Sequence, residues 1–152
     1  MAQVSTYLNF ERSTEEAFNF YKSIFGGEFT GQIMRLGDVP PSDGMPPLPE
    51  EDQNLVMHVE LKILDGLHTL RGTDSPECLG MPVVMGNNIH INLELDSREE
   101  TERYFHALSK GGKVTMELQD MFWGDYFGSC VDPFGIQWMF NCATTAKGSA
   151  DA

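Results

Sequence analysis

Hydrophobic and polar residues follow the same order twice along the chain. An alternating, strand-like run comes first, then a segment with apolar residues at helical spacing, then a Gly-Gly pair suited to a left-handed turn. The two copies occupy residues 4–27 and 89–112, and the second is offset from the first by 84 to 85 residues. More strand-like runs follow each copy. The sequence therefore predicts a duplicated unit of one strand, one helix and three strands.

Both helices carry start signals and an apolar stripe. Ser13 with Glu16, and Ser97 with Glu100, have the spacing of a capping box. The residues expected on the buried stripes are Ala17, Phe20, Tyr21 and Ile24 in the first helix, and Thr101, Tyr104, Phe105 and Leu108 in the second.

The alternation in the strands assigns each side chain to a face of its sheet. In the run at 89–95, isoleucines and leucines occupy one face, which we expect to pack on the helix, and polar residues occupy the other. The polar-face residues are Ser5, Tyr7 and Asn9 in the first strand, His58 and Glu60 in a later one, His90, Asn92 and Glu94 in the second copy, and Gln137, Met139 and Asn141 in the last strand.

Two segments break the strand pattern. Residues 36–54 are rich in Pro, Asp and Gly and predict a long acidic loop, and residues 74–87 connect the two halves. Neither has the character of an independent linker. We therefore expect one α+β domain over residues 1–142, with modules at about 4–74 and 88–141 and a flexible tail at 143–152.

Charge and composition narrow the class of protein. The net charge of −13 argues against binding to a nucleic acid backbone. No apolar stretch approaches the ~18 residues of a membrane span, and no signal-peptide pattern opens the chain. Three widely spaced cysteines, Cys78, Cys130 and Cys142, fit neither a disulfide framework nor a zinc motif. These features favour a cytoplasmic protein with reduced thiols.

Two longer motifs resemble a known family. NFERSTEEAFNFYKSIFGGE at 9–28 and WGDYFGSCVDPFGIQW at 123–138 are similar to the vicinal oxygen chelate superfamily, which includes glyoxalases, bleomycin resistance proteins and extradiol dioxygenases. Within it the chain looks most like the PhnB-like branch, and the likeness spans about residues 4–141. The resemblance implies two βαβββ modules forming a cup-shaped mixed sheet, and often a homodimer.

The resemblance also implies where a metal would bind. Metal-using members take four ligands, usually His, Gln or Glu, from the first and last strands of the two modules. His90 fills one of these positions in this chain. The other three hold Ser5 or Thr6, Met139, and Leu70 close to His68. The usual chelate set is therefore broken.

Other groups of residues leave alternatives open. His58 and Glu60, roughly 6–7 Å apart on one strand face, could join His90 in a two-His, one-carboxylate site for Fe, Zn, Mn or Ni. The alternative is hydrogen bonding between strands. Trp123 and Tyr126 could form an aromatic wall for a planar ligand, or pack within the protein or a dimer interface.

The sequence favours a protein that binds a small organic ligand in the cup without the usual chelate set and with no cofactor assigned. The alternative is a metal-dependent lyase or dioxygenase with a non-standard His/Glu site. No residue is assigned a catalytic role. The residues expected to contact the ligand are Tyr7, Asn9, His58, Glu60, His90, Asn92, Met139, Trp123 and Tyr126.

Overall fold

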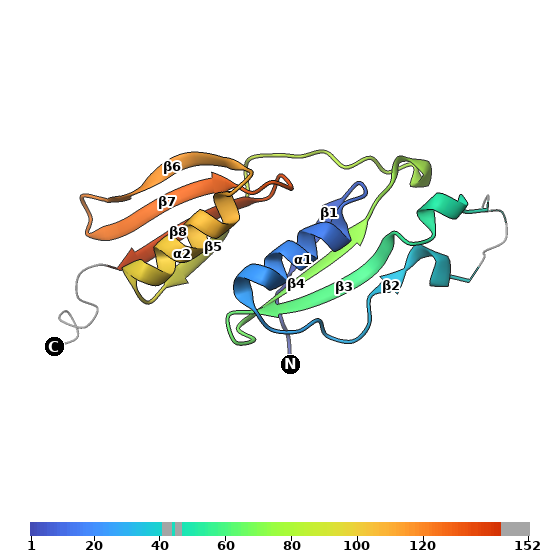
Figure 1. Ribbon diagram of the computed structural model, residues 1–152, viewed down its shortest axis with the longest axis horizontal. Coiled ribbons are helices and arrows are strands. Elements are labelled where there is room, and N and C mark those ends of the chain that lie inside the picture. The colour runs from blue at the N-terminus through green and yellow to red at the C-terminus, as the bar shows by residue number, and fades with distance from the viewer. Residues whose placement is uncertain (41–43, 45–46, 144–152) are drawn as a thin grey trace. The chain divides into compact units, whose positions relative to one another are not determined.

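Two four-stranded mixed sheets, each with one helix on a single face, make up the computed structural model of the chain (Figure 1). The structure describes residues 1–40, 44 and 47–143. The chain divides into two compact units, Met1–Val84 and Met85–Ala152. The predicted order of strand, helix and three strands is present in both units, which confirms the α+β class and the duplication.

The first unit has the strand order β1-β4-β3-β2, with β1 parallel to β4 and the other pairs antiparallel. Short 3₁₀ turns, η1 (Leu36–Asp38) and η2 (Glu50–Asp52), interrupt the predicted loop at 36–54, and η3 (Glu77–Leu79) follows the last strand. The main elements are β1 (Thr6–Phe10), α1 (Thr14–Phe25), β2 (Met34–Arg35), β3 (Val56–Ile63) and β4 (His68–Asp74).

The second unit repeats this topology with the order β5-β8-β7-β6. Its elements are β5 (Ile91–Leu95), α2 (Arg98–Ser109), β6 (Lys113–Asp120), β7 (Asp125–Val131) and β8 (Gln137–Ala143). Two predicted element boundaries in this unit were wrong. The strand predicted at 89–95 is β5, which begins at Ile91, and Ile89 ahead of it is 79% exposed. Ala143, expected in the tail, ends β8, and the rest of the predicted tail lies outside the described residues.

The face assignments of the strands hold in both units. Leu8, Phe10 and Leu70 are buried beneath α1, and Leu93, Trp138 and Phe140 beneath α2. Polar residues alternate with them on the opposite, helix-free face of each sheet. The three cysteines are all free thiols. No helix in the described part of the chain is long and apolar enough to cross a membrane.

The buried stripe of α2 is as predicted, whereas that of α1 is shifted. Thr101, Tyr104, Phe105 and Leu108 are buried in α2. In α1 the buried residues are Thr14, Ala17, Phe18 and Tyr21, so that Phe18 takes the place expected for Phe20 and Ile24. Phe18 fits because β4 carries Gly72 beneath it: a Cβ at Gly72 would lie 2.5 Å from the Phe18 ring.

The two helices begin differently, although their sequences look alike. The Ser97 hydroxyl accepts a hydrogen bond from the amide of Glu100 at 3.1 Å, as predicted for a cap. Ser13 makes no such bond, so the capping box expected there is wrong. Instead the carboxylate of Asp74 accepts the Thr14 amide at 3.0 Å and the Val56 amide at 2.8 Å. A buried β4 side chain thus anchors the start of α1 to the sheet.

In the second unit, Asp132 organises the conspicuous DPFGIQW segment. One of its oxygens accepts the amides of Phe134 and Ile136 at 2.8 and 3.1 Å. The other accepts the indole N–H of Trp138 at 2.9 Å. Gly135 provides the positive φ, 93°, that the turn into β8 requires. The motif is therefore explained by its structural role.

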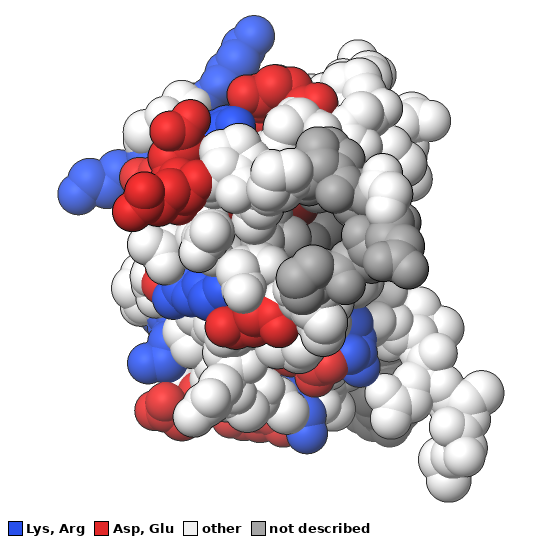
Figure 2. Space-filling view, turned by 90° about the vertical axis from the view of Figure 1, so that its right-hand side faces the viewer, with Lys and Arg blue, Asp and Glu red and all other residues white. Residues whose placement is uncertain are grey.

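Charged side chains of opposite sign lie side by side on the surface, as the face in Figure 2 shows. Arg12 bonds Asp52 at 2.6 Å and Glu77 at 2.9 Å, and its hydrogen bond lowers the pKa of the buried Asp52. The Arg12–Asp52 ion pair links η2, at the end of the acidic loop, to the segment between β1 and α1.

Candidate functional site

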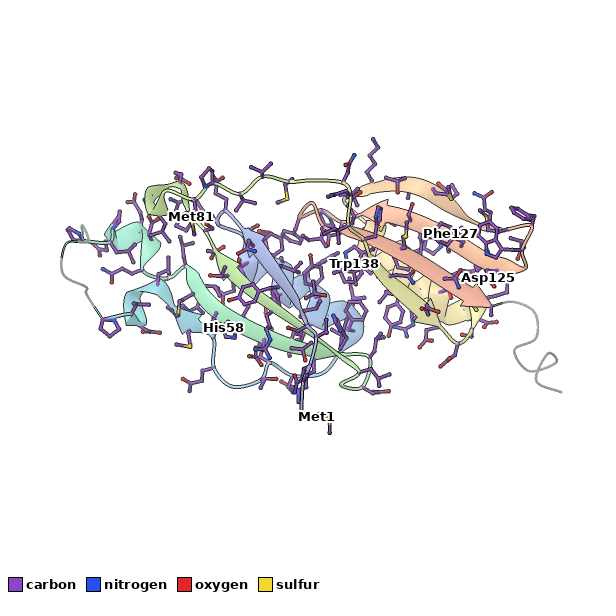
Figure 3. The ribbon with its side chains drawn as sticks, turned by 180° about the vertical axis from the view of Figure 1, so that it is seen from behind. Met1, His58, Met81, Asp125, Phe127 and Trp138 are labelled. Atoms are coloured by element: carbon purple, nitrogen blue, oxygen red, sulfur yellow. The ribbon has the colours of Figure 1, made fainter. Side chains whose placement is uncertain are left out.

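The helix-free face of the first sheet brings three of the predicted site residues into one hydrogen-bonded row. The Tyr7 hydroxyl lies 3.0 Å from Nδ1 of His58, and Nε2 of His58 lies 3.0 Å from Oε2 of Glu60. His58 stands on this face in the view from behind (Figure 3). Asn9 lies further along β1, opposite Thr73 and exposed, so it shares the face but not the row.

Arg71 of β4 completes the row. Its Nη1 donates to the same Glu60 oxygen that His58 contacts, and its Nε donates to the hydroxyl of Ser5 at 3.2 Å. The side chains of His58, Glu60 and Arg71 are only 28%, 20% and 30% exposed. The row is thus a partly desolvated network, in which hydrogen bonds are stronger than at an open surface.

The strand registers explain why these residues meet. Tyr7 is the parallel partner of Arg71, and Glu60 is its antiparallel partner, so all three side chains leave the sheet on the same side. Met34 of β2 is the cross-strand partner of His58 and is 46% exposed. Tyr7 at one end of the row and Met34 beside His58 are therefore both exposed next to its polar groups.

The charges in the row fix the direction of its hydrogen bonds. The hydrogen bond from His58, together with the charge of Arg71, lowers the pKa of Glu60, which is therefore a carboxylate and an acceptor. With Glu60 as the acceptor, His58 donates through Nε2, in the tautomer that leaves Nδ1 as an acceptor. Burial raises the pKa of Tyr7, so its hydroxyl keeps its proton and donates it to His58.

Arg71 was missed in the sequence, although the alternation of the strand at 68–74 places it on the polar face. The resemblance placed Leu70 at the metal-ligand position of this strand, and that prediction is wrong by one residue. Leu70 is fully buried against the helix side, as the partner of Thr6. The second unit pairs Asn92 with Met139 just as the first pairs Tyr7 with Arg71. Arg71 is therefore the equivalent of Met139.

The helix-free face of the second sheet has no comparable row of hydrogen-bonded side chains among the described residues. Asn92 and Met139 are neighbours across β5 and β8, and Asn141 donates to Asp125 at 3.1 Å. His90 is half-buried and immediately precedes β5. Asp125 and Phe127 appear on β7 in Figure 3.

The two aromatic candidates, Tyr126 and Trp123, lie in different environments. Tyr126 is 8% exposed and faces α2, where its hydroxyl donates to Glu102 at 2.7 Å and the Arg98 guanidinium lies 3.8 Å from its ring. It therefore does not share the helix-free face with the other candidates. Trp123 is 51% exposed in the β6–β7 turn, with its ring centroid 5.0 Å from that of Phe122.

The metal positions of the family do not fit these side chains. The β4 position holds the cation Arg71, and the β8 position holds the thioether Met139. The Thr6 hydroxyl is bonded to Nε2 of His68 at 2.8 Å. Within each unit, no group of three His, Cys, Asp or Glu among the described residues could hold a metal ion. The joint site of His58, Glu60 and His90 stays a prediction, because His90 belongs to the other unit.

Comparison with known proteins agrees with the family resemblance seen in the sequence. The family model of the Glyoxalase/Bleomycin resistance protein/Dioxygenase superfamily matches residues 7–140. Protein YjdN of Escherichia coli is 29% identical, over 91% of this chain and 93% of its own length. The crystal structure of protein PA1353 from Pseudomonas aeruginosa matches with 34% identity and a TM-score of 0.77, covering 93% of this chain and 98% of that one. A PhnB protein from Bacillus cereus matches with 26% identity and a TM-score of 0.72, over 93% of this chain and 100% of that one.

Proposed function

The chain belongs to the glyoxalase/bleomycin resistance protein/dioxygenase superfamily, and from that premise we propose that it binds a small organic ligand on the helix-free face of its first sheet. The observation that carries the proposal is the hydrogen-bonded row Tyr7–His58–Glu60–Arg71. Such a row holds its side chains in one arrangement before a ligand arrives, which lowers the entropic cost of binding.

The composition of the face indicates the kind of ligand. The exposed ring of Tyr7, at the end of the row, and the exposed, polarisable thioether of Met34 offer apolar surface next to the polar groups. Glu60 and Arg71 neutralise each other, so the row has no net charge when His58 is neutral. Both features favour a neutral or amphipathic organic molecule with an apolar part and a few hydrogen-bonding atoms.

A thermal-shift screen of small aromatic and antibiotic-like compounds tests the proposal. A ligand at 100 times its Kd adds about 2.7 kcal/mol to the free energy of unfolding. For a protein of this size we expect that to raise Tm by several degrees, roughly 5 °C. The Tm rise should disappear in Tyr7→Phe or His58→Ala and persist in His106→Gln, an exposed residue of α2.

Two results would contradict the proposal. A ligand whose stabilising effect survives in both Tyr7→Phe and His58→Ala would bind elsewhere. Near-stoichiometric Fe, Zn, Mn or Ni that is found by elemental analysis, and that is lost in His58→Ala and in His90→Ala, would instead support the metal-dependent lyase or dioxygenase. Elemental analysis of the wild type and both variants should therefore accompany the screen.

A further inference from the structure

Tyr7 stands apart from the other tyrosines of the chain. Of the four tyrosines, Tyr21, Tyr104 and Tyr126 are 0%, 6% and 8% exposed, whereas Tyr7 is 47% exposed. Tyr126 donates its hydroxyl to a carboxylate, but Tyr7 donates its hydroxyl to an imidazole. Tyr7 is therefore the tyrosine that can both meet a ligand and pass its proton to a base.

The order of groups behind Tyr7 is hydroxyl, imidazole, carboxylate. The two hydrogen bonds that connect them both measure 3.0 Å, within the range of a working nucleophile and base. In this arrangement the carboxylate holds the imidazole in the tautomer that can accept the hydroxyl proton, and it stabilises the imidazolium that results. Ordinary packing of a polar strand face does not require this order.

The remaining groups around His58 support the same assignment. Arg71 on β4 faces Glu60 and keeps it ionised, and Met34 on β2, opposite His58, does not titrate. Nε and Nη1 of Arg71 are used by Ser5 and Glu60, while Nη2 has no acceptor among the residues that the structure describes. A guanidinium donor is thus free beside Tyr7, its strand partner.

We propose that His58 and Glu60 activate the Tyr7 hydroxyl as a nucleophile, and that this face transfers acyl groups from activated esters. The inference rests on the same face as the proposed ligand binding and adds a chemical step to it. Tyr7 is the residue that reacts, His58 is its base, and Glu60 positions His58.

The step balances without an added oxidant or reductant. The Tyr7 oxygen forms a bond to the acyl carbon, and its proton moves to Nδ1 of His58. The negative charge that develops on the carbonyl oxygen is stabilised by a hydrogen bond from Nη2 of Arg71. The bond between the acyl carbon and the ester oxygen then breaks, and that oxygen leaves with the proton from His58. Water, with His58 again as base, adds to the acyl carbon of acylated Tyr7. The bond to the Tyr7 oxygen breaks, His58 returns a proton to that oxygen, and the acyl group leaves as a carboxylic acid.

p-Nitrophenyl acetate is the probe, used with the full-length protein. We expect a burst of p-nitrophenolate and an acetyl group on the Tyr7 peptide in the mass spectrum. The acetylation rate should rise with pH, because only the unprotonated imidazole of His58 can accept the hydroxyl proton. Tyr7→Phe removes the reacting oxygen and measures the background from other side chains.

Three variants show whether Tyr7 reacts because His58 activates it or only because it is exposed. We expect His58→Gln to slow acetylation of Tyr7 by roughly a hundredfold or more, because a general base of this kind contributes about 10²–10⁴. Glu60→Gln should slow it by about tenfold or more and change the pH profile. Tyr126→Phe, which removes a hydroxyl on the helix side of the other unit, should leave the acetylation rate unchanged.

Acetylation of Tyr7 that is no faster than that of N-acetyltyrosinamide in the same solution would overturn the inference. An unchanged rate in His58→Gln would do so as well. If that variant fails to fold, as judged by circular dichroism, Glu60→Gln and the wild-type pH profile still decide. Rapid acetylation without any ligand in the thermal-shift screen would refute the proposed binding function while leaving the activated Tyr7 intact.

Discussion

The absence of a side chain at Gly72 allows α1 to pack closely on its sheet. Gly72 lies in the middle of β4, and the Phe18 ring fills the space above it. Side chains in such a close-packed contact have no room to move aside, because the ring is fully buried. The contact explains why Phe18 is buried in a position where the helical pattern suggested Phe20.

Replacement of Gly72 by Ala should therefore destabilise the protein. The new Cβ would lie 2.5 Å from the Phe18 ring, and overpacking of this kind costs about 1–3 kcal/mol. Gly86→Ala is the matched control, because its Cβ meets its nearest neighbour at an ordinary 3.5 Å. Urea unfolding should show a lower midpoint for Gly72→Ala and little change, or a slight gain, for Gly86→Ala. Equal midpoints would refute the tight contact.

At the scale of elements, the two helix starts show how similar sequences reach different solutions. Both segments read as capping boxes, but only Ser97 accepts the expected amide. At the start of α1 the amide of Thr14 is bound instead by Asp74, which is 60 residues away in the sequence. Asp74 reaches α1 because β1 and β4 are parallel neighbours and Asp74 is the partner of Phe10. A sequence window around Ser13 contains no sign of this distant acceptor.

The two serines should therefore differ in their contribution to stability. Ser97→Ala removes a cap and should cost about 1 kcal/mol of the free energy of unfolding. Ser13→Ala removes no side-chain bond to the helix and should change it by less than about 0.5 kcal/mol. Urea unfolding of both variants in parallel checks the difference. A loss for Ser13→Ala as large as that for Ser97→Ala would contradict the assignment of the cap to Asp74.

At the scale of the whole molecule, the duplication and the face assignments could be predicted from the sequence, because strand and helix periods are local properties. The alternation placed Tyr7, His58 and Glu60 on one face, and the structure joins them. What could not be predicted depends on strand register. Arg71 becomes part of the row only because β4 lies between β1 and β3 in one particular register.

Tyr126 illustrates the same limit. Its aromatic neighbours suggested a ligand wall, but it alternates with Gly128 and Cys130 on the face that packs beneath α2. The face of a strand between two glycines is hard to assign from the sequence, since glycine does not mark either face. Pairing with β8 settles it, because Cys130 is opposite the buried Trp138.

Two exposed aromatic side chains of the second unit bear on the assembly state. Phe122 and Trp123 are 97% and 51% exposed in the β6–β7 turn, and adjacent exposed aromatic rings are typical of protein interfaces. We expect a homodimer, as the family resemblance implies, with this turn in the contact. Sedimentation velocity should then give twice the chain mass of 17.0 kDa.

Phe122→Ser should shift the mass toward that of a monomer, because it removes apolar area from the contact. Leu67→Ser is the control, since Leu67 is also an apolar residue in a strand-connecting turn and is 84% exposed. It should leave the dimer intact. A monomer in the wild type would refute the dimer, and a dimer unaffected by Phe122→Ser would place the contact on another surface. In the second case Trp123 should remain as accessible to a fluorescence quencher as its 51% exposure in the single chain indicates.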